Sequence, residues 1–156
     1  MTVPKIGDEI PDIQLPATGD QTISLSALRG KRLVLYFYPK ANTSGCAQEG
    51  RDFRDAITEF SALDTVILGA SRDGVKAQGN FKAKQEFPFD LLSDKEEALC
   101  NLFDVIKLKM MYGKQARGIE RSTFLIDEKG ILRKEWRKVK VKGHVDEVLQ
   151  AVRELG

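Results

Sequence analysis

The sequence contains little cysteine and histidine, and it has no long apolar segment. Two cysteines in 156 residues exclude the disulfide framework of a small secreted domain. A single histidine excludes a typical cluster of Cys and His ligands, so we predict no metal site. No stretch approaches the roughly 20 apolar residues of a membrane helix, and residues 1–16 lack a basic start followed by an apolar run. We therefore expect a cytoplasmic protein without a membrane partner.

The sequence has no large excess of positive or negative charge, since its formal net charge is only +2. This value argues against a nucleic-acid partner. One local exception is the segment 132–142, "LRKEWRKVKVK", which holds six basic residues. The habits of edge strands favour a solvated strand protected by lysine, and binding to nucleic acid or an acidic surface stays the alternative. The length and mixed composition predict one domain over residues 1–156.

Apolar runs at 32–38 and 65–70 are rich in β-branched and aromatic residues, which predicts two buried strands. Between them, Phe53, Ile57 and Phe60 recur at helical spacing and predict a helix from about residue 44 to about residue 60. A strand, a helix and a second strand form the βαβ unit of a parallel sheet.

The same kind of pattern continues along the chain. We predict a helix at 73–86, a short strand at 89–92, an acid-started helix at 94–103, a hairpin of strands 121–127 and 131–137, and a closing helix at 144–155. A small hairpin is expected within residues 12–28. These elements predict an α/β fold, a thioredoxin-like three-layer sandwich with a mixed central sheet and an N-terminal β-hairpin. In the expected loop "LKMMYGK", Met110, Met111 and Tyr112 could line a pocket mouth, form a subunit contact, or pack on their own sheet.

Cys46 follows the turn-rich segment "PKANTSG" (39–45) and precedes the periodic helix, which places it in the first turn of that helix. Unpaired N–H groups and the positive end of the helix dipole favour a thiolate there. The position three residues earlier is Thr43, so dithiol exchange within this loop is excluded. A threonine hydroxyl at that spacing can donate a hydrogen bond to the sulfur or to an oxygen beside it.

The stretch "FYPKANTSGCAQEG" (37–50) resembles the signature of peroxiredoxins of the bacterioferritin comigratory protein (Q) subgroup. The resemblance extends over nearly the whole chain, through "SRDGVKAQGNFKAKQEFPFDLLSD", "GIERSTFLID" and the terminal "HVDEVL". It implies that Cys46 is the peroxidatic cysteine, that Thr43 is a hydroxyl donor, and that Arg121 assists the reaction. An always-charged guanidinium beside the sulfur suits a thiolate that attacks a peroxide. Without the cysteine motif, Arg121 would be interpreted as a surface residue paired with Glu120 or Glu128.

The resemblance also implies supporting roles for three further residues. Pro39 would shield the sulfur, Tyr38 would contribute to the wall of the pocket, and Glu49 would support the arginine. The implied activity is reduction of hydrogen peroxide and alkyl hydroperoxides through a sulfenic acid, without metal or organic cofactor. A sensor or thiol-transfer protein that relays oxidation to a partner is the alternative. The family resemblance favours a monomer.

The sequence departs from its family at the resolving cysteine. The two positions where the subgroup carries it hold Arg51 and Lys82. The remaining thiol, Cys100, lies among apolar residues and has the features of a core residue, although a two-cysteine cycle through Cys100 stays open. We therefore expect one-cysteine behaviour, with thioredoxin or glutathione and glutaredoxin as the reductant.

Overall fold

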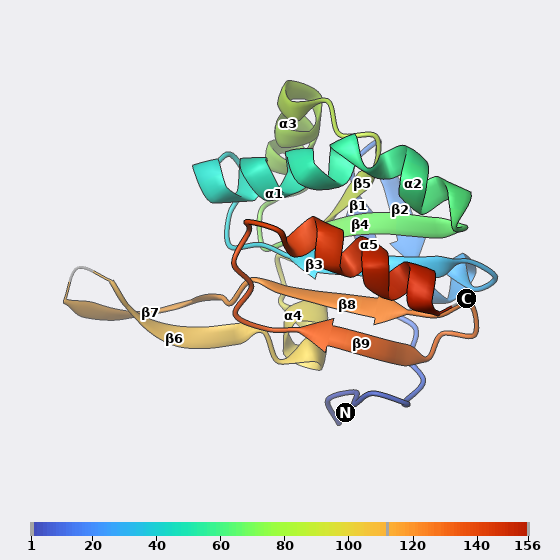
Figure 1. Ribbon diagram of the computed structural model, residues 1–156. Helices are drawn as coiled ribbons and strands as arrows, with labels where there is room; N and C mark the ends of the chain where they lie inside the picture. Colours follow the sequence, from blue (N-terminus) through green and yellow to red (C-terminus); the bar gives the residue numbers. More distant parts are fainter. Residues whose placement is uncertain (1, 112, 156) are drawn as a thin grey trace.

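A seven-stranded mixed sheet forms the centre of the computed structural model, which describes residues 2–111 and 113–155 (Figure 1). The strand order is β2-β1-β5-β4-β3-β8-β9. The strands are β1 Gln14–Ala17, β2 Gln21–Ser24, β3 Arg32–Phe37, β4 Thr65–Ser71, β5 Asp90–Ser93, β8 Ser122–Ile126 and β9 Leu132–Trp136. Strands β3, β4 and β5 are parallel, whereas β8 runs antiparallel to β3. The predicted βαβ unit, mixed sheet and β8–β9 hairpin are confirmed.

Helices cover both faces of the sheet. They are α1 Ser44–Asp55, α2 Ile57–Ala62, α3 Val75–Gln85, α4 Ala98–Phe103, α5 His144–Glu154 and the 3-10 helix η1 Leu25–Leu28. One buried cluster joins the sheet to α1, α2, α3 and α5, and a second joins its opposite face to η1 and α4. The three predicted layers are therefore present. Within the described part of the chain, no helix has the length and apolar character needed to cross a membrane.

Alternation along β3 decides which side chains join which cluster. Val34 and Tyr36 belong to the cluster under α1 and α5, whereas Leu33, Leu35 and Phe37 belong to the cluster under α4. Successive side chains of a strand point to opposite faces, so one apolar strand supplies both cores. Continuous apolar character is typical of such a doubly covered strand.

The predicted N-terminal hairpin is present and is part of the main sheet. Strands β1 and β2 pair antiparallel, and Ala17 of β1 pairs with Leu92 of β5. At the other end of the sheet, β9 is an edge strand, as the lysine-rich segment predicted. Arg133 there forms an ion pair with Asp127 at 3.2 Å.

Two predicted helices have different bounds in the structure. The helix expected over 44–60 is interrupted at Ala56, whose φ of −99° and ψ of 5° separate α1 from α2. Helix α4 begins at Ala98 rather than near Asp94, and the Asp94 carboxylate instead accepts hydrogen bonds from backbone N–H groups at its start.

The expectation of a loop in "LKMMYGK" was wrong. Strands β6 Ile106–Met111 and β7 Lys114–Ile119 form an antiparallel hairpin, and Gly113 has a φ of 78°, which a two-residue hairpin turn favours. The alternation of Ile106, Leu108 and Met110 was the available signal. Tyr112 lies outside the described residues.

We predict opposite stability effects for two glycine-to-alanine substitutions. A Cβ at Gly50 of α1 would overlap the ring of Phe87, which is buried and stacked on Phe89. We expect Gly50→Ala to lower the free energy of unfolding by about 1–3 kcal/mol. Gly79→Ala in α3 meets no atom within 4 Å and should raise this free energy by about 0.5–1 kcal/mol. Urea denaturation of both variants tests this pair, and a neutral Gly50→Ala would contradict the packing.

Candidate active site

The loop between β3 and α1 presents Cys46 at the start of a helix. Thr43 is extended, with φ of −88° and ψ of 153°, and α1 begins at Ser44. Cys46 is therefore the third helical residue, which confirms its predicted place in the first turn. Only 1% of Cys46 is exposed. The backbone before it turns at Asn42, whose φ of 65° is a conformation that asparagine tolerates.

Arg121 directly precedes β8 and reaches both Cys46 and Glu49. Its Nη2 donates to Cys46 Sγ at 3.4 Å, and its Nη1 donates to Glu49 Oε1 at 2.6 Å. The side chain of Arg121 is 15% exposed and that of Glu49 is fully buried. The arginine is thus no surface residue, and its carboxylate partner is Glu49 rather than Glu120 or Glu128.

Gly45 gives Arg121 the space for this approach. A Cβ at Gly45 would lie 3.3 Å from Arg121 Nη2, closer than such atoms normally come. In the sequence, Gly45 was interpreted only as a turn former. A glycine directly before the cysteine was the available signal, because a residue without a side chain lets another group approach the backbone closely.

The segment between β3 and α1 contains three further predicted site residues, Tyr38, Pro39 and Thr43. Their contacts differ. The hydroxyl of Thr43 donates to the carbonyl oxygen of Lys40 at 2.9 Å. Pro39 is half-buried, at the end of β3. Tyr38 is fully buried in the same apolar cluster as Cys46. Of the three, only Tyr38 shares a buried cluster with Cys46, and the Thr43 hydroxyl is bonded to the backbone of its own loop.

A buried polar network, which sequence reasoning missed, supports this loop from beneath. The hydroxyl of Tyr38 donates to Gln78 Oε1, and Gln78 Nε2 donates to Ser71 Oγ at 2.9 Å. Ser71 donates to Asp73 Oδ2 at 2.6 Å, and the same oxygen accepts the N–H of Ala41 at 2.8 Å. Paired polar groups of this kind fix one conformation of the surrounding chain. The network holds the loop in register with β4 and α3.

The buried Glu49 has an unusual electrostatic environment. Burial raises its pKa to about 7, although the neighbouring Arg121 opposes this shift. Its second oxygen, Oε2, has no hydrogen-bond partner among the described residues. Desolvation disfavours a charged carboxylate, and a nearby cation compensates only in part.

His144 lies close to this centre and stays neutral. It is the first residue of α5, it is buried, and its Nε2 lies 2.7 Å from the hydroxyl of Thr123. Burial, followed by the charge of Arg121, lowers the pKa of His144 to about 4. In residues 2–111 and 113–155, no group of three or more metal-ligating side chains comes together.

Cys100 lies on the opposite face of the sheet from Cys46. It belongs to the cluster that contains Leu35 and Phe37, whereas Cys46 belongs to the cluster that contains Tyr36. Burial, and then Asp94, raise the pKa of the Cys100 thiol well above its ordinary value. Both thiols are free.

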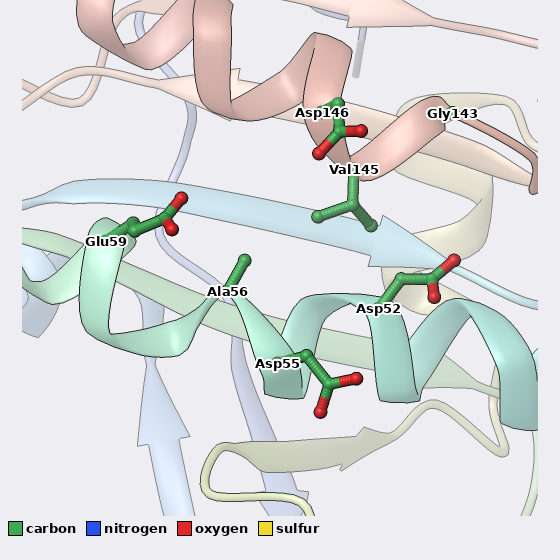
Figure 2. A pocket seen from close by; sticks show the side chains of 7 residues that line it. All are labelled: Asp52, Asp55, Ala56, Glu59, Gly143, Val145 and Asp146. Carbon is green, nitrogen blue, oxygen red and sulfur yellow. The ribbon is translucent and has the colours of Figure 1, made fainter.

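A separate cavity of about 370 Å³ lies between α1, α2 and the start of α5 (Figure 2). Figure 2 shows four carboxylates around it, from Asp52, Asp55, Glu59 and Asp146. The lining contains no thiol and no basic side chain. Cys46 does not line this cavity, and an acidic wall does not favour a thiolate.

Comparisons with known proteins agree with this site. The chain matches the AhpC/TSA family over residues 6–135. It is 52% identical to peroxiredoxin Bcp of Bacillus subtilis, covering 99% of this chain and 98% of that one. A structure of Xanthomonas campestris peroxiredoxin Q aligns with a TM-score of 0.87 at 53% identity, over 91% of this chain and 90% of the other. A PrxQ cysteine-to-serine variant from Xylella fastidiosa aligns with a TM-score of 0.93 at 42% identity, over 99% and 98%.

The chain therefore belongs to the AhpC/TSA family. Its likeness to the peroxiredoxin Q structures confirms the predicted thioredoxin-like fold. It is a thiol-dependent peroxidase, an enzyme that uses a peroxide as substrate and a thiol as reductant.

We predict that ionisation of Glu49 makes the protein less stable as pH rises. An acid whose pKa is higher in the folded state than its ordinary 4.5 binds more protons when folded between pH 4.5 and about 7. The free energy of unfolding, relative to that of Glu49→Gln, should then fall across this window by at most about 1.4 kcal/mol per pH unit. Above pH 7 the difference should be constant.

Urea denaturation between pH 4.5 and 8 measures this difference, with Cys46→Ser in both proteins to prevent oxidation of the thiol during the experiment. His144 binds a proton on unfolding between about pH 4 and 6.5 and has the opposite slope, but it contributes equally to both proteins. A difference independent of pH would contradict the raised pKa of Glu49.

Proposed function

We propose that this enzyme reduces hydrogen peroxide and alkyl hydroperoxides through a sulfenic acid at Cys46. The observation that carries the proposal is the Arg121 guanidinium, which contacts Cys46 Sγ while the buried Glu49 holds its other nitrogen. A structural study of the Xanthomonas campestris relative, with a trapped intermediate and a ligand, concerns alkyl peroxide reduction. An alkyl hydroperoxide is accordingly included in the proposed substrate class.

The reaction begins with attack of the Cys46 thiolate on the terminal oxygen of the peroxide. An S–O bond forms as the O–O bond breaks, and the leaving oxygen takes a proton to become water or an alcohol. Sulfur is thereby oxidised to sulfenic acid, and the peroxide is reduced. Arg121 would stabilise the thiolate and then the charge that moves onto the departing oxygen.

Three neighbours would complete the pocket. The Thr43 hydroxyl, which now donates to a backbone carbonyl, would turn toward the bound peroxide and donate to it. Pro39 and Tyr38 would limit access of water to the sulfur. Exclusion of water strengthens each of these electrostatic contacts.

We propose that an external thiol, rather than a second cysteine of this chain, reduces the sulfenic acid. The sheet lies between the cluster of Cys46 and that of Cys100, and the raised pKa keeps Cys100 protonated and therefore a poor nucleophile. Arg51 and Lys82, at the two expected resolving positions, donate hydrogen bonds to Gln85 and Asp90 instead. Thioredoxin, or glutathione with glutaredoxin, would be the reductant of a monomeric enzyme in the cytoplasm.

The arginine fork predicts a kinetic defect in Arg121→Lys. A lysine has one ammonium group and cannot hold Glu49 and the sulfur at once in this geometry. We expect oxidation of Cys46 by peroxide to be slower by a factor of about 10² to 10³. Stopped-flow oxidation measures this rate, and Arg32→Lys, at the far end of β3, is the matched control. Equal oxidation rates for Arg121→Lys and the control would contradict the proposed role of Arg121 in the reaction of Cys46.

The separation of the two thiols predicts a nearly neutral Cys100→Ser. Turnover with thioredoxin should stay within about a factor of two of the original, because Cys100 forms no disulfide in the cycle. Mass spectrometry after one equivalent of peroxide should find sulfenic acid or its over-oxidised forms at Cys46. A Cys46–Cys100 disulfide, or loss of thioredoxin turnover in Cys100→Ser with peroxide oxidation intact, would mean a two-cysteine cycle.

A further inference from the structure

The hairpin of β6 and β7, residues 106–119, extends away from the body of the protein; we call it the basic arm (Figure 1). Its strands pair with each other in a sheet of two and do not join the central sheet. A two-stranded hairpin alone has marginal stability in water. Such a segment gains most from a contact with a partner.

The basic arm exposes large apolar side chains. Leu108 is 67% exposed and Met110 is 68% exposed, and Ile6 is the other large apolar residue with comparable exposure among those described. The register pairs Leu108 with Arg117 and Met110 with Gln115, so these four side chains share one face of the hairpin. Adjacent apolar side chains bordered by polar ones are typical of a protein-binding surface.

The charge of the basic arm has one sign. Residues 106–119 contain four basic residues and no acidic residue: Lys107, Lys109, Lys114 and Arg117. Lys107 and Arg117 are paired with Asp104 and Glu97 at the base of the arm. The register places Lys107, Lys109 and Lys114 on the face opposite Leu108 and Met110, so most of the positive charge lies on the other side of the arm. The arm as a whole fits an acidic partner surface, and two arms from two copies of the chain would repel each other.

The basic arm is connected directly to the active site. Strand β7 ends at Ile119, two residues before Arg121, whose guanidinium contacts Cys46. Arg72 donates to the carbonyl oxygen of Arg117 at 3.3 Å and so ties the arm to the end of β4. Cys46, which is 1% exposed, lies at this same end of the sheet, because its loop follows β3 and Arg121 precedes the neighbouring β8.

We propose that the basic arm docks the protein that reduces oxidised Cys46, a dithiol protein with an apolar patch and acidic side chains around its reactive cysteine. The inference rests on the proposed reduction by an external thiol. The partner's thiolate attacks Cys46 Sγ, an S–S bond forms, the S–O bond breaks, and hydroxide takes a proton to leave as water. The partner's second thiolate then attacks the partner's own sulfur in the mixed disulfide and releases the Cys46 thiolate.

Two variants of the full chain separate the apolar from the charged contribution. One is Leu108→Ser with Met110→Ser, and the other is Lys109→Glu with Lys114→Glu. The matched control is Lys31→Glu with Lys129→Glu, two exposed lysines at the other end of the central strands. The probes are reduced thioredoxin, as the acidic dithiol protein, and dithiothreitol, as an uncharged small thiol.

We expect each arm variant to reduce kcat/KM for thioredoxin at least about ten-fold, because apolar contact and charge steering both contribute to a transient complex. Reduction by dithiothreitol and the rate of Cys46 oxidation by peroxide should be unchanged. Added salt should lower kcat/KM in the original protein and in the control, and much less in the lysine variant.

The inference is overturned if thioredoxin reduces the arm variants as fast as the control. It is also overturned if sedimentation shows a dimer that dissociates in Leu108→Ser with Met110→Ser, with thioredoxin turnover intact, since the arm would then join two copies. Failure of the proposed function looks different, because Cys46 of the original protein would then not be oxidised by peroxide or not be reduced by any thiol.

Discussion

The ion pair between Arg121 and Glu49 is the constraint around which this active site is built. The carboxylate is fully buried and the guanidinium nearly so, and loss of one partner of a buried pair typically costs about 3–5 kcal/mol. Glu49 can relieve part of that cost by binding a proton, since its pKa is raised to about 7. Arg121 cannot reduce this cost in the same way, because its guanidinium keeps its charge. Its free nitrogen is left to contact the sulfur, which is the position where negative charge is needed.

The sheet topology brings the pair and the thiol together. Phe37 at the end of β3 pairs with Ser122 at the start of β8, because these neighbouring strands are antiparallel. Arg121 directly precedes β8, and the loop that leads to Cys46 directly follows β3. Both therefore lie at the same end of these two neighbouring strands. Gly45 then leaves the space for the side chain to cross to the sulfur. No local feature of either segment could achieve this alone.

The same sheet keeps the two cysteines apart, and the departures at the resolving positions reinforce the folded state. Arg51 donates to the side chain of Gln85 and Arg54 to its backbone carbonyl, both at 2.9 Å, which fastens α1 to the end of α3. Lys82 is paired with Asp90 at 2.8 Å. At the two positions where the family carries a resolving thiol, Arg51 therefore joins α1 to α3, and Lys82 joins α3 to β5. These contacts are consistent with the proposal that α1 stays folded while an external thiol reduces Cys46.

The sequence by itself determined the succession of most strands and helices along the chain, the place of Cys46 in the first turn of a helix, and the family resemblance. These features depend on local signals: apolar runs, turn-forming residues and fixed motif spacing. The break at Ala56 and the β6–β7 hairpin were missed, because weak periodicity there is overruled by packing and by pairing between strands. The family resemblance implied that Glu49 supports Arg121, 72 positions away, and the tertiary structure supplied the contact: a buried ion pair whose second guanidinium nitrogen reaches Cys46. Only the tertiary structure decided that Cys46 and Cys100 face opposite cores. Contacts at such separation depend on how the sheet closes, which no local pattern specifies.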